Sequence, residues 1–278
     1  MSAHCRRAPR NKGVGGVSGN LWISASGMET RSWQIAALAN DVANTDTAGF
    51  KAQLPVSAAV APLAAYPGGL AGGGAAPGAV LAGGGVVPLS LRVDFSQGPL
   101  QHTGRPLDLA IVGNGLFTLR NAAGTTVYSR QGAFLVDAAG HLVDGAGRQL
   151  LGLQGKPLTL PAGATAVAVD RTGGVSALVG GHRQTVGQVG LSVPADPQGL
   201  TGSGPGVWQA GPASGAVAVL PPGTGAAGHL ASGFLEQSNA SLTTLLPSLL
   251  SAQRAYQMNA RAFSVGLQVW NLANQLLA

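Results

Sequence analysis

The C-terminal stretch of the chain restricts its fold more than any other feature. From Leu242 onward a large, mostly apolar residue recurs at every seventh position: Leu242, Leu249, Tyr256, Phe263, Trp270 and Leu277. The partner positions between them are Leu246, Gln253, Ala260, Leu267 and Asn274. This alternation of four and three residues is typical of a coiled-coil seam and predicts a helix from Ser241 to Leu277. We therefore expect this helix to have a helical partner.

A second heptad near the N-terminus supplies that partner. Its positions are Leu21, Met28, Ile35 and Val42, with Ala25, Ser32 and Ala39 between them. The pattern predicts a helix from about Asn20 to Asn44, with Asn20 as its N-cap. The simplest arrangement pairs the two terminal helices and makes the middle of the chain an insertion. The alternative is two unrelated amphipathic helices packed on one core.

The middle of the chain has the pattern of short strands and tight turns. The strand candidates are 107–112, 117–120, 127–129, 134–136, 141–143, 165–169, 175–178 and 189–193. Asn114-Gly115 stands between the first two and predicts a hairpin that joins them. Since no helical segment separates these runs, the fold class is α+β and mainly β. An antiparallel β domain is inserted between N- and C-terminal heptad helices that pair as a coiled coil.

These patterns divide the chain into five parts. We expect a flexible leader at 1–18, a helix with a terminal turn at 19–53, a connector at 54–88, the β domain at 89–230 and the last helix at 231–278. The connector contains only Gly, Ala, Pro, Val and a few other uncharged residues, and it predicts a loosely ordered segment. Pro247 implies that the last helix begins near that residue or is kinked there.

Few residues offer chemistry. The five histidines are not at metal-ligand spacing, and the carboxylates of Asp137 and Asp144 stand in Gly-rich stretches where turn formation explains them. We expect no catalytic residue, cofactor or metal. The net charge of +6 arises partly from four basic residues within the first twelve positions, without a basic stripe elsewhere, so nucleic-acid binding is not expected. The pattern also predicts neither membrane insertion nor a cleaved signal peptide.

Three blocks of sequence resemble the signatures of bacterial flagellar rod and hook proteins. They are residues 21–28 with 39–51, residues 98–111 with 128–134, and residues 233–239 with 253–259. Asp41 stands where the family pattern has Asn. The signature positions are Asn40, Asn44, Gly49, Phe50, Lys51, Glu236, Ser238, Asn239, Gln253, Arg254, Tyr256 and Asn259.

The resemblance implies a structural subunit of the basal-body rod. It implies that the paired terminal helices form the inner tube of the axial structure, with the β domain outside. It also implies export across the inner membrane by the flagellar type III apparatus without signal cleavage. The implied partners are copies of the chain and other rod and hook axial proteins, which assemble helically into a shaft that transmits torque for motility.

Two other classes of function remain as alternatives. One is an exported β-rich adhesin or glycan-binding module with a helical stalk. It would need an aromatic-lined site within 89–230, where the aromatic residues are Phe95, Phe117, Tyr128, Phe134 and Trp208. Core packing explains most of these. An enzyme is the less supported alternative, because the sequence offers no constellation of catalytic groups.

Overall fold

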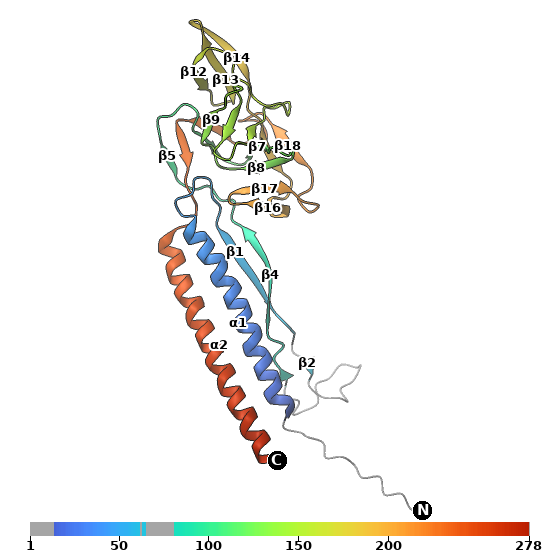
Figure 1. Cartoon of the computed structure of the whole chain (residues 1–278). Coiled ribbons are helices and arrows are strands. Elements are labelled where there is room, and N and C mark those ends of the chain that lie inside the picture. The colour runs from blue at the N-terminus through green and yellow to red at the C-terminus, as the bar shows by residue number, and fades with distance from the viewer. Residues whose placement is uncertain (1–13, 62, 65–80, 278) are drawn as a thin grey trace, which may run out of the picture. The chain divides into compact units, whose positions relative to one another are not determined.

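The computed structural model describes residues 14–61, 63–64 and 81–277, and these fall into two compact units (Figure 1). The helical unit comprises the described residues of 1–39, 55–91 and 246–278, and the β unit comprises 40–54 and 92–245. The chain is mainly β with a helix at each end, so the predicted fold class is confirmed. The coiled-coil pairing within that prediction stays a prediction.

Two long helices, α1 (Val14–Ala43) and α2 (Leu242–Leu277), contact each other in the helical unit. A Cβ added at Gly27 would stand 2.6 Å from Nδ2 of Asn259, and one added at Gly266 would stand 2.9 Å from Cδ2 of Leu21. The earlier residue of α1 meets the later residue of α2, so the helices run antiparallel. Each glycine lets a longer side chain of the opposite helix approach its backbone.

The least exposed positions of α2 differ partly from the predicted seam. They are Leu245, Leu249, Ala252, Ala255, Asn259, Ala260, Phe263, Gly266, Trp270 and Ala273. Leu249, Phe263 and Trp270 belong to the predicted heptad and Ala260 is a predicted partner position, but the other partner positions lie one residue earlier than expected. Leu246 and Leu267, predicted as partners, are 48% and 40% exposed. The prediction of those partner positions is wrong because the less exposed face uses small residues, which allow close approach, and leaves these two leucines outward.

The start of α1 also differs from prediction. α1 begins at Val14, so Asn20 lies inside the helix and residues 14–18 are not a leader; residues 1–13 lie outside the described part. A capping side chain contributes only about 1 kcal/mol, too little to fix a boundary where the helix can continue. α2 begins at Leu242, one residue after the predicted Ser241, and contains Pro247, so the helix does not begin at the proline.

The range 54–88 is not wholly a loose connector. It contains β1 (Gln53–Ala59), β2 (Leu63–Ala64), β3 (Leu81–Ala82) and the start of β4 (Val86–Val93), while 62 and 65–80 lie outside the described residues. β1 pairs with β4 and β2 with β3. Two hydroxyls of α1 hold the ribbon formed by β1 and β4: Thr30 Oγ1 donates to Val86 O (3.2 Å), and Ser26 Oγ accepts from Val86 N (3.3 Å). Helix contacts order a segment whose composition suggested no structure.

The β unit is built on an antiparallel sheet of nine strands. Its order is β16-β17-β8-β7-β11-β10-β9, and β15 pairs with both β7 and β18. The bounds are β7 Leu116–Arg120, β8 Thr126–Ser129, β9 Phe134–Val136, β10 Leu142–Asp144, β11 Gln149–Leu150, β15 Leu191–Pro194, β16 Leu200–Gly204, β17 Val207–Ala210 and β18 Val217–Leu220. A short 3-10 helix at Pro197–Gly199 precedes β16.

Three smaller sheets complete this unit. One contains β12 (Ala164–Val169), β13 (Gly174–Val179) and β14 (His182–Gln188). In the others, β5 (Leu100–His102) pairs with β20 (Phe234–Glu236), and β6 (Leu109–Val112) pairs with β19 (His229–Ser232). The last two pairings return the segment before α2 to the start of the β unit. They therefore bring together two of the sequence blocks that resemble the flagellar signatures.

The hairpin predicted at Asn114-Gly115 is wrong. β6 and β7 flank this dipeptide, but they lie in different sheets and do not pair. Gly113 and Gly115 have φ angles of 104° and 125°, and a Cβ on Gly113 would stand 3.1 Å from Cα of Gly228. The glycines here allow the chain to cross from one sheet to another past a neighbouring backbone, which the local sequence pattern does not distinguish from a hairpin.

Asp137 and Asp144 are turn residues, as predicted. In each case Oδ1 accepts hydrogen bonds from the backbone N–H groups two and four residues later. Asp170 makes the same pair of bonds to Thr172 and Gly174. A carboxylate that replaces backbone partners in a tight turn has a structural role.

The core of the β unit should distinguish two adjacent residues of β9. Phe134 is fully buried and packs edge-to-face on Phe117 with ring centroids 5.2 Å apart, whereas Leu135 is 50% exposed. We expect Phe134→Ala to lower the free energy of unfolding by about 3–5 kcal/mol and Leu135→Ala by less than about 1 kcal/mol. Urea denaturation measures both, and equal losses would contradict the placement of the core.

Candidate functional site

The turn that follows α1 is anchored by the segment that precedes α2. Gly49 has a φ of 69°, and its N–H donates to the carbonyl oxygen of Glu236 at 2.7 Å. A Cβ here would stand 2.5 Å from the backbone of Arg130. Both the left-handed conformation and the close approach require glycine at this position. Phe50, the next residue, is 2% exposed.

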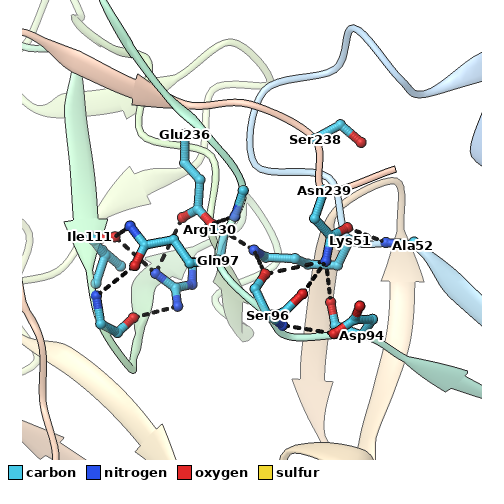
Figure 2. Close-up of polar contacts among 12 residues, drawn as sticks. Lys51, Ala52, Asp94, Ser96, Gln97, Ile111, Arg130, Glu236, Ser238 and Asn239 are labelled. Atoms are coloured by element: carbon cyan, nitrogen blue, oxygen red, sulfur yellow. Dashed lines mark hydrogen bonds and ion pairs between the residues drawn. The ribbon is translucent and has the colours of Figure 1, made fainter. Parts of the chain in front are cut away.

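Lys51 ends in the interior of the β unit. Its side chain is fully buried, and Nζ donates to Oε1 of Glu236 and to the carbonyl oxygen of Ser96, each at 2.6 Å (Figure 2). A buried ammonium is costly unless it has such partners. Lys51 therefore fixes the chain after α1 to both the segment before α2 and the loop that leads into β5.

Glu236 is the centre of this cluster. Oε1 also accepts from the backbone N–H of Gly98 at 2.9 Å, and Oε2 accepts from Nη1 of Arg130 at 3.2 Å. Arg130 further donates to the carbonyl oxygens of Ile111 (3.2 Å) and Gly113 (2.6 Å). One carboxylate thus joins four separate segments of the β unit, and we call Lys51, Arg130 and Glu236 the ion cluster.

Burial opposes the charge on both cations of the ion cluster. It lowers the pKa of Lys51, and the hydrogen bond and charge of Glu236 act in the opposite direction. It also lowers the pKa of Arg130, again against the charge of Glu236. A buried ion pair adds little net stability over an apolar replacement, but removing one partner leaves the other charge unpaired. The cluster therefore enforces one arrangement of the four segments.

Asn239 makes a second set of bonds next to the ion cluster. Its Oδ1 accepts from Ala52 N at 2.8 Å, and its Nδ2 donates to Asp94 O at 2.8 Å (Figure 2). Asp94 N in turn donates to Ala52 O at 2.9 Å. An amide side chain has both the acceptor and the donor that these two backbone segments need. Ser238 Oγ accepts from Ala240 N at 3.1 Å, close to the start of α2.

Asp41 is a buried carboxyl in the last turn of α1. It is 1% exposed, and both of its oxygens accept from the N–H of Gln53 at 3.0 and 3.1 Å. Burial raises its pKa to about 6, while the bond from Gln53 acts in the opposite direction. Since the family pattern has Asn here, this chain carries an ionisable group at a position that otherwise holds a neutral one.

The structure brings together about half of the signature residues named from the sequence. Gly49 and Lys51 bond to Glu236, and Asn239 accepts from the N–H of the next residue, Ala52. Phe50 is buried between Gly49 and Lys51. Asn44 closes the end of α1, where Nδ2 donates to the carbonyl oxygen of Asn40 at 2.8 Å. The remaining signature residues lie further along α2: Gln253, Arg254 and Tyr256 are exposed, and Asn259 stands against Gly27.

The heptad residues occupy less buried positions. Leu21, Met28, Ile35, Val42, Leu249, Phe263 and Trp270 are partly buried. Leu242 and Tyr256 are 46% and 39% exposed, and the side chain of Leu277 lies outside the described part.

Sequence reasoning did not select Arg130, Ser96 or Gly98 as site residues. Arg130 stands in a block that resembles the family, at Tyr128 to Phe134, but the block was read as part of the β domain. Ser96 and Gly98 contribute backbone groups, which carry no signal in a side-chain pattern. Only the long-range pairing of β5 with β20 brings them to Glu236.

The arrangement is structural rather than chemical. Its charges are held in ion pairs and backbone hydrogen bonds. Among the described residues, no three His, Cys, Asp or Glu side chains lie together as metal ligands would. Neither helix is long and apolar enough, over its described residues, to cross a membrane.

Comparison with known domain families matches two parts of the chain. Residues 110–177 match the "Flagellar hook protein FlgE/F/G D1 domain", and residues 231–276 match the "Flagellar basal body rod FlgEFG protein C-terminal" family. The first covers β strands from β6 to β13, and the second covers β19, β20 and nearly all of α2. These matches define the class, which is the axial proteins of the flagellar rod and hook.

Full-length relatives narrow the class. The chain is 33% identical over 262 residues to the flagellar basal-body rod protein FlgG of Bacillus subtilis strain 168, covering 90% of this chain and 96% of the relative. It is 31% identical to FlgG of Agrobacterium fabrum, with 92% and 98% covered. The flagellar hook protein FlgE of Escherichia coli K12 is 32% identical over 158 residues, 54% of this chain and 34% of the hook protein.

The chain belongs to the family of flagellar basal-body rod proteins. The resemblance predicted from the sequence blocks is confirmed. The chain is therefore a structural subunit of the rod in the flagellar basal body, and membership supports assembly with other flagellar axial proteins. The findings give no support to a surface-binding module.

The ion cluster predicts a large effect of removing one charge. We expect Lys51→Met to lower the free energy of unfolding by about 3–5 kcal/mol, because Glu236 loses one partner in the interior. Lys156→Met is the control: its side chain is exposed and makes no ion pair among the described residues, so the expected loss is at most about 0.5 kcal/mol. Urea denaturation of both variants measures the difference, and similar losses would contradict the role of Lys51.

Asp41 predicts a pH-dependent difference. The folded protein holds this proton up to about pH 6, whereas the unfolded chain releases it near 3.8. The stability due to the protonated carboxyl is thus complete below pH 3.8 and is lost as the pH rises through 6. We expect the free energy of unfolding of the Asp41→Asn variant, relative to that of the natural chain, to increase between pH 4 and pH 7, by up to about 3 kcal/mol.

Urea denaturation at several pH values measures this gain, with Asp46→Asn as the exposed control. A difference between the Asp41→Asn variant and the natural chain that stays constant from pH 4 to 7 would show that burial does not shift this carboxyl.

Proposed function

We propose that this rod subunit assembles helically with copies of itself into the torque-transmitting shaft of the flagellum. The observation that carries the proposal is the exposure of apolar side chains on the helical unit. Of the twenty exposed large hydrophobic residues in the described part, thirteen belong to this unit. Nine of them are on α2: Leu246, Leu250, Tyr256, Met258, Val265, Leu267, Val269, Leu272 and Leu276.

Such a surface is unusual for a protein that remains monomeric. Contiguous exposed apolar area of this kind marks an interaction site. The low charge of α2 also indicates an interaction site, since Arg254 and Arg261 are its only charged residues. Contacts between unlike surfaces of successive copies form a ring only when the rotation between copies closes. When the rotation does not close, the copies form an open helical filament.

Other parts of the proposal follow from family membership. We propose that the chain reaches the rod through the flagellar type III export apparatus without signal cleavage, and that it binds neither nucleic acid nor a catalytic substrate. The full-length relatives described above are all named FlgG, which favours a FlgG-type segment of the rod. Deleting the gene should leave basal bodies without a complete rod and cells that do not swim, and the natural gene should restore both.

Charged substitutions on α2 test the assembly surface. Leu250 and Leu272 are 54% and 57% exposed, so Leu250→Glu with Leu272→Glu should leave the unfolding midpoint of the subunit nearly unchanged. The same double variant should fail to restore swimming and fail to form sedimentable assemblies. Leu135→Glu, 50% exposed in the β unit, is the matched control. Normal swimming of the double variant would contradict assembly through α2.

A further inference from the structure

Trp22 is an exposed aromatic residue on α1. Its side chain is 61% exposed, and its indole N–H donates to the carbonyl oxygen of Gly84 in the segment before β4 at 3.3 Å. This bond fixes the ring on the side of α1 that carries the ribbon. A tryptophan that is both ordered and exposed is the kind of side chain that dominates protein interfaces.

A groove of about 580 Å³ lies elsewhere on the same unit, between α1 and α2. Its floor is apolar and includes small residues. The lining residues are Ile23, Ser24, Arg261, Ala262, Val265, Gly266 and Val269. Gly266 and Ala262 leave the space, because neither carries a long side chain.

Trp22 and the groove face different directions. Successive residues of a helix are about 100° apart, so Ile23 and Ser24 point away from Trp22. Trp22 is not among the lining residues and is held by the ribbon instead. A protruding residue on one face and a recess on another join copies head to tail, which is the geometry of an open assembly.

We propose that Trp22 of one copy of this chain inserts into the groove between α1 and α2 of the next copy. The inference rests on the proposed function and names one contact between successive copies. The occupant of the groove is a second copy in the same orientation. The recess of about 580 Å³ is large enough to admit an indole ring.

Charge supports both the partner and the orientation. Glu29 lies two helical turns after Trp22, is exposed, and has no ion-pair partner within the described residues. Arg254 and Arg261 of α2 are likewise exposed and unpaired there. The helical unit therefore carries an unpaired acid on α1 and unpaired bases on α2, which two copies can match. α1 also carries the exposed base Arg31, whose Nη1 donates to Oε1 of Gln34 at 2.6 Å.

The positions of these charges along the helix axes are compatible with this contact. The contacts of Leu21 with Gly266 and of Gly27 with Asn259 set the antiparallel level of the two helices. On that scale Trp22 is level with about residue 264 of α2, inside the groove, and Glu29 with about residue 257, between Arg254 and Arg261. Each arginine is then about 5 Å from Glu29 along the axis, at 1.5 Å per residue.

The opposite orientation of the second copy does not match. It would place Glu29 level with about residue 271, at 1.5 Å per residue along the same axis. Asn271 and Leu272, the residues at that height, are uncharged. Charge therefore favours parallel copies.

The test measures self-association of the full chain by sedimentation velocity and pelleting over a range of concentrations. We expect Trp22→Ala to raise the concentration needed for assembly at least about tenfold, as loss of a central anchor does. Leu135→Ala is the control and should assemble as the natural chain does. Circular dichroism and the thermal midpoint show that each variant is folded.

A charge exchange separates contact from folding. Glu29→Arg should weaken assembly, and adding Arg254→Glu and Arg261→Glu should restore it in the triple variant. Assembly of Trp22→Ala at the natural concentration overturns the inference, as does a folded triple variant that stays as defective as Glu29→Arg. So does a Trp22→Ala chain that self-associates normally but no longer binds a hook-type axial protein. In these cases assembly through α2 still stands.

A natural chain that never self-associates overturns the inference as well. If its gene deletion also leaves a complete rod, the proposed function fails with it.

Discussion

The carboxylate of Glu236 is the interaction on which the described architecture depends. It pairs with a buried ammonium and a buried guanidinium together, and the backbone carbonyl oxygen of the same residue accepts from the N–H of Gly49. The four segments that meet there are far apart in sequence and include the turn after α1 and the strand before α2. Because a buried charge tolerates no loss of its partner, this small cluster holds the turn after α1 against the strand before α2.

The two units are stabilised by different interactions. The β unit buries a continuous apolar core and closes its turns with Asp and Gly, so it has what a stable domain needs. The helical unit leaves much of α2 exposed and holds its ribbon to α1 partly through the hydroxyls of Ser26 and Thr30. This division suits the proposed assembly, in which the β unit is complete in one chain and the helices are completed by other copies.

The periodicity of apolar residues predicted the helices and strands well, and it predicted which of them pair less well. The heptads identified both helices, and alternating apolar runs identified most strands of the β unit, because these signals are local. The hairpin prediction at Asn114-Gly115 was wrong because this dipeptide occurs both in hairpins and where a chain crosses between sheets. Only the pairing of β6 with β19 distinguishes the two cases. The ribbon at β1 and β4 was missed because its order comes from α1. Lys51 and Glu236 were selected by family likeness, but their meeting 185 positions apart was not predictable from spacing.

The central claim is that the helices of a single copy are incomplete. Hydrogen exchange tests it most directly, by comparing a dilute monomer with the assembled protein. The account predicts slow exchange in β7 and β8 in both states, and slow exchange in α1 and α2 only after assembly. Equal protection of the helices and the β core in the dilute monomer would contradict it, because the helices would then be stable without a neighbour.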